Sequence, residues 1–361
     1  MPRNPRKKVG RKKGYRRFIG RKGKDHSFYN RKKGMIEHPT NDNDSSQVET
    51  MKQAQESVSL KDDSLVFHGF GDMEDHKKPA RVLSLFDYGI SVGRYCLDKL
   101  KIAVQCYYSS EIDEKALKLQ RYNFGDKVIP LGCIKNITSD MLRSLGNIDI
   151  LLAAPPCQGF SPANAKRLGL PGENGKLFKE LTRILKDLQK INEENNTKLY
   201  FLCENVRSME KEVRAEITRS IGCEPFVHNA KKYGYMKRAR LFWNNFPQIE
   251  DEENNSNEGG HLGDILSCNR TANVMILPTL TTTYQSQITG KKDRKLPVLD
   301  DGKESVLLTV EKERAFGLPT SFTDGADLSI GDRSKLLGQA WCANSMLEIM
   351  KPLTKVFKTY D

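Results

Sequence analysis

The sequence predicts an α/β fold with a largely parallel sheet from residue 81 onward. Between residues 81 and 205, short runs rich in β-branched and aromatic residues alternate with amphipathic stretches of helical periodicity. Such alternation is typical of βαβ units, in which helices cover both faces of a parallel sheet. Polar and reactive residues follow several predicted strands directly, and parallel sheets bind ligands beyond the carboxyl ends of their strands.

Each strand is predicted from a short run with high β propensity, and each helix from apolar residues spaced three or four apart. The predicted strands cover residues 81–86, 104–111, 127–131, 147–154 and 198–205. A turn over residues 87–93 leads into a first helix that runs through Leu100, and later helices cover residues 114–123, 139–145 and 176–191. Residues 237–243 predict a further extended segment.

The net charge of +13 comes from one end of the chain. Residues 1–34 hold 15 Lys and Arg against one acid, Asp25, whereas residues 35–79 hold ten acids against four Lys. Neither segment has the apolar content of a packed core, so we expect a disordered basic arm followed by an acidic, polar linker. A dense basic arm gains affinity for phosphates by counterion release, which favours a nucleic-acid-binding arm or nuclear import signal over a merely solubilising extension.

The composition excludes several other classes of protein. The sequence has no run of roughly 18 to 20 apolar residues, which a membrane helix needs, and no apolar core of a secretory signal in its first 30 residues. The eight Cys include no C-x-x-C pair, which argues against a zinc site or a disulfide framework. We therefore expect a soluble intracellular protein without a structural metal.

The turn after the first strand has the composition of a nucleoside-binding loop. It contains Gly89 and Gly93, and the acid Glu111 closes the second strand. Glycines allow the backbone to turn tightly beneath a cofactor, and an acid at this position can accept both ribose hydroxyls. The pattern alone leaves a nicotinamide cofactor and S-adenosylmethionine equally open.

The fourth and fifth strands end in residues suited to covalent catalysis. The fourth strand runs into Pro155-Pro156-Cys157, where the two prolines stiffen the loop that presents the thiol. The fifth strand ends in Glu204-Asn205. A thiol and a carboxyl group at neighbouring strand ends suit methyl transfer to carbon 5 of cytosine, because thiolate addition at carbon 6 makes carbon 5 nucleophilic.

That reaction also needs a cation at the carbonyl oxygen of the ring, where negative charge develops. Arg238 and Arg240 lie two residues apart in the predicted extended segment, so their side chains share one side of it. Such a pair is usually solvated and indicates a site only together with Cys157 and Glu204.

With these three motifs in the order P-P-C-Q-G-F-S, E-N-V and R-A-R, residues 81–361 resemble the DNA cytosine-5 methyltransferases. The segments Val82–Asp87, Arg238–Trp243, Glu313–Pro319 and Leu336–Trp341 resemble most closely the catalytic domain of the animal de novo enzymes. The resemblance implies a Rossmann-like S-adenosylmethionine-dependent methyltransferase sheet with a small target-recognition subdomain, here a short insertion at residues 244–278 within a domain of residues 80–361. It also implies double-stranded DNA as the substrate, a flipped-out target cytosine and a nuclear location.

By the same resemblance, Cys157 is the nucleophile, Glu204 acts at ring nitrogen 3, and Arg240 contacts the cytosine oxygen, with Arg238 and Asn205 in support. The C-terminal segment is implied to fold back and complete the sheet. The implied S-adenosylmethionine-binding residues are Phe86, Asp87, Gly89, Ile90, Gly93, Glu111, Ile112, Ile134, Pro155 and Trp341.

The sequence departs from the family pattern at several positions. Tyr88 lengthens the cofactor turn by one residue, and Cys133 stands where the family commonly has an Asp that binds the adenine amino group. Thr283 replaces a base-reading residue, so a CpG preference does not carry over. Lys179 and Ile330 replace residues of the family's self-association surfaces, which predicts weaker or differently arranged homo- or hetero-oligomers with related methyltransferases.

Two other functions remain open from the sequence. A catalytically weak DNA-binding or accessory partner of another methyltransferase would explain the altered cofactor loop, although it would have no need of Cys157, Glu204 and Arg240 together. Methylation of RNA is the other, since a flipped cytosine looks similar in either polymer.

Overall fold

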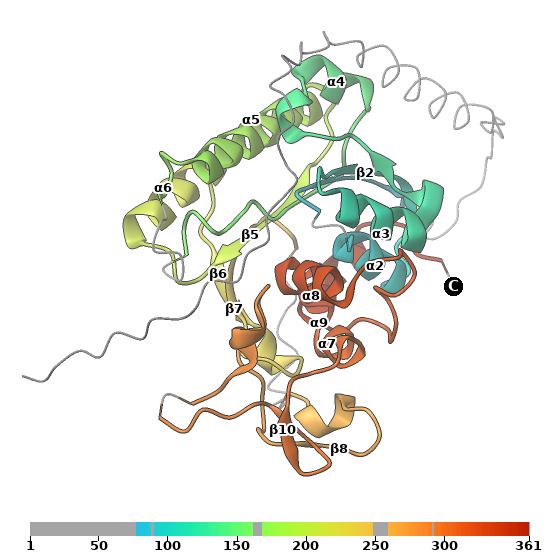
Figure 1. Cartoon of the computed structure of the whole chain (residues 1–361). Helices are drawn as coiled ribbons and strands as arrows, with labels where there is room; N and C mark the ends of the chain where they lie inside the picture. Colours follow the sequence, from blue (N-terminus) through green and yellow to red (C-terminus); the bar gives the residue numbers. More distant parts are fainter. Residues whose placement is uncertain (1–76, 88–89, 162–167, 248–258, 291, 361) are drawn as a thin grey trace, which may run out of the picture. The chain divides into compact units, whose positions relative to one another are not determined.

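The computed structural model describes residues 77–87, 90–161, 168–247, 259–290 and 292–360. A seven-stranded sheet with the order β3-β2-β1-β4-β5-β7-β6 dominates this part of the chain (Figure 1). Strands β1 to β5 are parallel, and β7 pairs antiparallel with both β5 and β6. The strands are β1 (Ala80–Leu85), β2 (Val104–Ser110), β3 (Ile129–Pro130), β4 (Ile150–Ala153), β5 (Tyr200–Val206), β6 (Phe226–Asn229) and β7 (Ala239–Asn244).

Helices connect the parallel strands, which confirms the predicted α/β class. The helices are α2 (Val92–Lys99), α3 (Glu114–Phe124), α4 (Ser139–Ser144), α5 (Glu173–Glu194), α6 (Lys211–Ile221), α7 (Thr309–Ala315), α8 (Ile330–Gln339) and α9 (Ala343–Met350). The longest, α5, buries Phe178, Leu181, Leu185 and Leu188 on one face because these residues recur every three or four positions. No helix in the described ranges is long and apolar enough to span a membrane.

The third strand is much shorter than predicted. It lies at the edge of the sheet and consists of Ile129 and Pro130 alone. Proline has no amide hydrogen to donate, so it is tolerated only where one side of a strand needs no partner. The long helix shows the opposite deviation, extending beyond the predicted residues 176–191 at both ends.

The order of the strands places a ligand-binding crevice. β1 pairs with β2 on one side and with β4 on the other, so the chain direction across the sheet reverses at β1. Ligands of doubly wound sheets bind at such a switch point, beyond the carboxyl ends of the strands. The loops that follow β1, β2, β3 and β4 meet there.

The C-terminal segment covers the sheet with helices, which corrects the prediction that it completes the sheet. Helix α9 packs against α2, and the buried Met346 and Met350 of α9 join the main hydrophobic core. Among the described residues after β7, none forms a strand of the large sheet, and one isolated β-bridge joins Thr359 to Ile102, two residues before β2.

A second, three-stranded sheet forms the small subdomain, and it extends beyond the predicted insertion. Its strands β8 (Arg270–Ala272), β9 (Val298–Asp300) and β10 (Lys303–Ser305) pair antiparallel in the order β10-β9-β8. Residues 244–278 thus supply one strand of three. Arg270 holds the subdomain together through ion pairs with Asp300 at 2.5 Å and with the buried Glu311 of α7 at 3.0 Å.

Candidate active site

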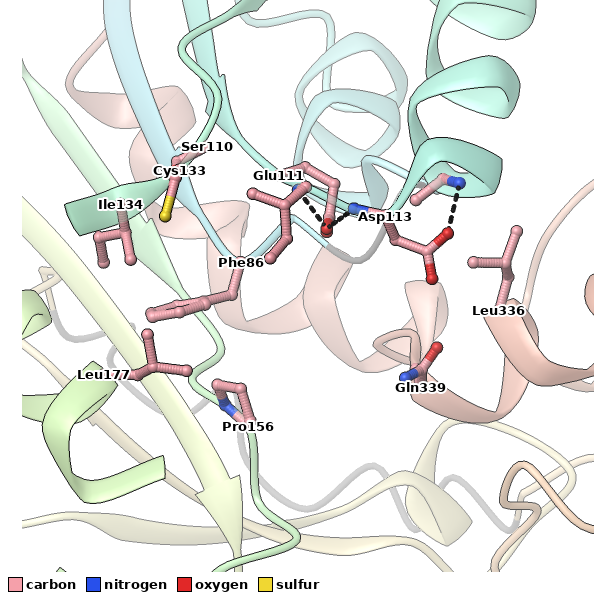
Figure 2. A pocket seen from close by; sticks show the side chains of 12 residues that line it. Phe86, Ser110, Glu111, Asp113, Cys133, Ile134, Pro156, Leu177, Leu336 and Gln339 are labelled. Atoms are coloured by element: carbon pink, nitrogen blue, oxygen red, sulfur yellow. Dashed lines mark hydrogen bonds between the residues drawn. The ribbon is translucent and has the colours of Figure 1, made fainter. Parts of the chain in front are cut away.

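The loops at the switch point enclose a cavity of about 200 Å³. Figure 2 shows its lining residues, which lie at or beyond the carboxyl ends of β1, β2, β3 and β4 or belong to helices α3, α5 and α8. One part of the lining is apolar and is formed by Phe86, Ile134, Pro156 and Leu177, together with the thiol of Cys133. Polar groups of Glu111, Asp113 and Gln339 line the rest.

Glu111 is the best-positioned polar group of this cavity. Its Oε1 accepts hydrogen bonds from the backbone amides of Ile112 at 2.7 Å and Asp113 at 2.9 Å. Oε2 has no hydrogen bond within the described ranges, so it can accept one from a ribose hydroxyl. Burial raises the pKa of Glu111, and the two amide hydrogen bonds oppose that rise. Ile112 lines the same cavity while 69% exposed, an arrangement suited to packing against a ligand ring. A nucleoside with an aromatic base and a ribose diol therefore fits these residues.

The predicted cofactor residues divide into two groups in the structure. Phe86, Glu111, Ile112 and Ile134 line the cavity, and Pro156 lines it where Pro155 was predicted. Gly89 lies outside the described residues. Ile90 and Gly93 do not line the cavity, because Ile90 is fully buried in the core and a Cβ added at Gly93 would collide with Leu152 and Tyr107.

Asp87 also differs from its predicted role, because its carboxylate is the centre of a buried hydrogen-bond network. It accepts hydrogen bonds from the hydroxyls of four residues and from the side-chain amide of Gln120. The four hydroxyl donors are Ser84, Ser91, Tyr107 and Ser109. Phe86, with a φ of 57°, turns the chain so that its own ring faces the cavity while Asp87 faces the interior. Asp87 thus ties the cofactor loop to β1, β2 and α3.

Replacing Asp87 by alanine is expected to destabilise the fold rather than to weaken cofactor binding selectively. The change leaves several buried donors without their acceptor, at about 1 to 3 kcal/mol for each group that finds no new partner. We expect the free energy of unfolding to fall by about 3 kcal/mol or more in denaturant titrations. Glu111→Gln is the contrasting variant, with an expected loss of cofactor affinity at nearly unchanged stability. Equal stability of Asp87→Ala and wild type would contradict the structural role.

Cys157 follows the cavity-lining Pro156 on a tightly turned loop. The backbone amides of Phe160 and Ser161 both donate to the carbonyl of Cys157 at 2.9 Å, and the buried ring of Phe160 anchors the turn. Asn205 fastens the other side of the loop, since its Nδ2 donates to the carbonyl of Pro155 at 3.3 Å. Asn205 is buried and holds the loop that precedes Cys157 in place.

Glu204 and Arg240 meet between β5 and β7. Arg240 Nε lies 2.9 Å from Glu204 Oε1, and both side chains are largely buried. The indole Nε1 of Trp341 donates to Glu204 Oε2 at 3.4 Å, which places Trp341 beside the carboxylate rather than in the cofactor cavity. Arg240 also lines an open groove of about 420 Å³ with the exposed Arg207 and Lys237.

Arg238 has a different environment from Arg240 although the two are only two residues apart. Its guanidinium donates to the carbonyls of Leu280, Gly338 and Ala340 and lies over the ring of Phe316. Burial lowers the pKa of Arg238 to about 9, which leaves it charged at neutral pH. Arg238 is thus a positioning residue that joins β7 to α8 and to the chain before η5 (Tyr284–Gln287).

The three charged side chains act on the thiol of Cys157. Burial is the largest influence and raises its pKa above the usual 9.0, and the negative charge of Glu204 raises it further. Arg240 and Arg238 oppose this rise. The thiol of Cys157 is therefore harder to ionise than an ordinary cysteine thiol, and Glu204 and the two arginines act on its pKa in opposite directions.

The pH dependence of alkylation tests this balance. Because only the thiolate reacts, the rate of Cys157 alkylation by iodoacetamide should rise with pH and level off only above pH 9. Glu204→Gln removes a charge that raises the pKa of Cys157, so its profile should shift to lower pH. Arg240→Gln should shift it to higher pH. Mass spectrometry of the modified peptides gives the rates, with the exposed Cys268 as the reference thiol in the same chain. Identical profiles in all three proteins would show that these side chains do not act on Cys157.

Several cavity residues carried no signal in the sequence that identified them individually. Leu177 is the second residue of the predicted long helix, and Asp113 lies just beyond Glu111. Leu336 and Gln339 lie in one of the segments that carry the family resemblance, but only the folded chain shows that α8 closes the cavity.

A Rossmann-like sheet with a nucleoside cavity at its switch point defines this chain as an S-adenosylmethionine-dependent methyltransferase fold. Two solved structures have a similar fold. The Entamoeba histolytica methyltransferase EhMeth has a TM-score of 0.59 and 16% identity, and the match covers 78% of this chain and 100% of that one. The S. pombe Dnmt2 methyltransferase has a TM-score of 0.56 and 16% identity, and the match covers 77% of this chain and 99% of that one.

The sequence matches are more specific about the family. The model of the C-5 cytosine-specific DNA methylases matches residues 80–242. Type II methyltransferase M.NgoBV of Neisseria gonorrhoeae is 36% identical over 124 residues, which is 34% of this chain and 26% of that protein. Type II methyltransferase M.BanI of Aneurinibacillus aneurinilyticus is 37% identical over 122 residues, 34% of this chain and 25% of that protein. The matched part of this chain thus spans about a quarter of the length of these relatives. The matches support the C-5 cytosine-specific DNA methylase family, whose members use S-adenosylmethionine, and the cavity described above fits that cofactor.

Proposed function

We propose that this protein is a DNA (cytosine-5)-methyltransferase that methylates a flipped-out cytosine through a covalent adduct with Cys157. The observation that carries the proposal is the placement of Cys157 directly after the cavity-lining Pro156, where Glu204 and Arg240 act on its thiol. A nucleophile, a carboxyl group and a cation around one point are the set that this reaction needs.

Each side chain has one task in the proposed reaction. The sulfur of Cys157 forms a bond to carbon 6 of cytosine, and Glu204 supplies a proton or hydrogen bond to nitrogen 3. Arg240 stabilises the ring oxygen as electron density moves toward it. S-adenosylmethionine supplies an electrophilic methyl group. After methyl transfer, a base removes the proton from carbon 5, the bond between sulfur and carbon 6 breaks, and Cys157 is released.

The polymer and its context are part of the proposal. DNA is supported by the family match and by the basic arm of residues 1–34, which suits phosphate binding. We further propose de novo activity and nuclear location, on the resemblance of the catalytic segments and on the arm. We also propose altered self-association, because Lys179 and Ile330 are both exposed and Ile330 is 72% exposed.

The decisive experiment measures transfer of labelled methyl from S-adenosylmethionine to unmethylated duplex DNA and to tRNA. We expect transfer to DNA well above transfer to tRNA, with 5-methylcytosine as the product. Transfer to tRNA alone would replace DNA by RNA in the proposal. Absence of transfer to both polymers, with DNA binding intact, would instead support an accessory partner. Sequencing of the products gives the context preference that Thr283 leaves open.

A further inference from the structure

A cluster of lysines lies on the edge of the large sheet that is opposite the active site. Lys78 lies two residues before the start of β1, Lys101 lies three residues before β2, and Lys198 lies two residues before β5. Strand β1 is parallel to β2, and it is also parallel to β5 because β4 pairs in parallel with both β1 and β5. The amino ends of the three strands therefore lie on one edge of the sheet. The active-site loops follow the carboxyl ends of the same strands. The lysine cluster and Cys157 therefore face opposite ways.

The C-terminal chain adds two further lysines to this edge. The carbonyl of Lys78 accepts a hydrogen bond from the amide of Lys358, and the carbonyl of Lys358 accepts one from Ala103. The amide of Tyr360 donates to the carbonyl of Lys101, and its hydroxyl donates to the carbonyl of Asp98 in α2 at 3.2 Å. Lys355 stands three residues before Lys358 and is exposed. We call Lys77, Lys78, Lys101, Lys198, Lys355 and Lys358 the rear lysine patch.

The charge of the rear lysine patch is largely uncompensated. Among the described ion pairs only one, from Lys78 to Asp149 at 2.7 Å, involves a member of the patch. Asp98, whose backbone carbonyl lies beside Tyr360, is paired with Arg94 instead. Lys198 lies over the ring of Tyr200, and that ring contacts Phe357 of the C-terminal chain. The Nζ of Lys77 donates to the carbonyl of Thr354 at 3.4 Å. Within the described ranges, the ammonium groups of Lys101, Lys355 and Lys358 have no ion pair, hydrogen bond or ring contact, so these three members of the patch can bind anions.

We propose that the rear lysine patch binds the phosphates of a second nucleic-acid segment while the active site holds the first. The proposal rests on the proposed function, because it takes nucleic acid as the polymer. Several lysines without arginine or a base-reading groove suit contact with the phosphate backbone rather than sequence recognition. In the sequence, the acidic linker and the basic arm precede Lys77 and Lys78. One molecule would thereby hold two segments on opposite sides of its sheet.

Protection of lysines from acetylation tests the proposal in the full-length protein. The protein is treated with an acetylating reagent with and without a saturating concentration of duplex DNA of about 30 base pairs, roughly three helical turns. Mass spectrometry then gives the extent of acetylation of each lysine. We expect DNA to reduce acetylation of Lys101, Lys355 and Lys358 several-fold, with Lys118, Lys186 and Lys190 unprotected. These last three are exposed lysines on the helices α3 and α5. Equal acetylation of the patch lysines with and without DNA overturns the proposal, as does protection by polyglutamate but not by DNA.

Binding measurements give a second readout that does not depend on protection. The triple variant with Lys101, Lys355 and Lys358 changed to Gln should lower the salt slope of DNA binding by about 2 to 3, near 0.9 for each lost phosphate contact. The matched control changes Lys118, Lys186 and Lys190 to Gln and should leave the slope unchanged. Methyl transfer to a short duplex should be nearly unaltered by either variant. If transfer occurs but the patch is unprotected, only this inference fails. If the patch is protected but no transfer occurs, only the proposed function fails.

Discussion

Cys157→Ala is expected to abolish methyl transfer while leaving the fold and the cofactor cavity intact. Alanine cannot form the bond to carbon 6, so carbon 5 keeps almost no nucleophilicity. We expect turnover to fall by at least about 10⁴-fold, as for other enzymes that lose their covalent nucleophile. The measurement is methyl transfer to duplex DNA at saturating S-adenosylmethionine. Cys268→Ala, at an exposed cysteine, is the matched control and should retain full activity.

A trapped adduct separates this chemical role from a structural one. In DNA that contains 5-fluorocytosine, fluorine replaces the proton that must leave carbon 5, so elimination is blocked and the protein stays bonded to the base. Wild type and Cys268→Ala should give a complex that survives denaturing electrophoresis, and Cys157→Ala should give none. An adduct that persists in Cys157→Ala would assign the nucleophile to another residue.

Glu204→Gln is the second substitution with a large expected effect. Glutamine keeps the shape of the side chain but cannot deliver a proton to nitrogen 3, and it removes the charge that holds Arg240 at 2.9 Å. General acid–base groups contribute about 10²- to 10⁴-fold, so we expect kcat to fall within that range. The cofactor dissociation constant should change little, because Glu204 does not line the cavity.

Glu111→Gln provides the opposite pattern of effects. Glu111 lines the cofactor cavity and is not one of the charged side chains that act on the pKa of Cys157. Its replacement should therefore raise the KM for S-adenosylmethionine more than it lowers kcat. The two variants together distinguish the cofactor part of the site from the base part. A fall in kcat alone for Glu111→Gln, or a rise in KM alone for Glu204→Gln, would reverse the two assignments.

The positions of the chemical residues could be predicted because strand ends are visible in the sequence. A buried run followed by Pro155-Pro156-Cys157 places the thiol at the ligand edge whatever the details of packing, and Glu204 follows from the same reasoning. The directions of side chains could not be predicted. Asp87 and Phe86 are neighbours after β1, but the positive φ of Phe86 directs its own ring to the cavity and turns Asp87 into the core.

Contacts between segments that are far apart in the chain could not be predicted from the sequence either. Trp341 was predicted to contact the cofactor, whereas its indole reaches Glu204 from a loop 137 positions away. The small sheet draws β9 and β10 from residues after the predicted insertion, because a three-residue strand such as β8 is stable only when paired. Pairing partners of this kind are set by tertiary packing and leave no local pattern.

The guanidinium of Arg238 has a consequence for how the two ligands of the site communicate. It is bonded to carbonyls at the end of α8, the helix that supplies Leu336 and Gln339 to the cofactor cavity, and it stands two residues from Arg240 on the base side. A displacement of α8 would therefore also move the start of β7, through a single buried cation. If cofactor binding displaces α8, binding of cofactor and of target base are thermodynamically linked, each changing the affinity for the other by the same factor.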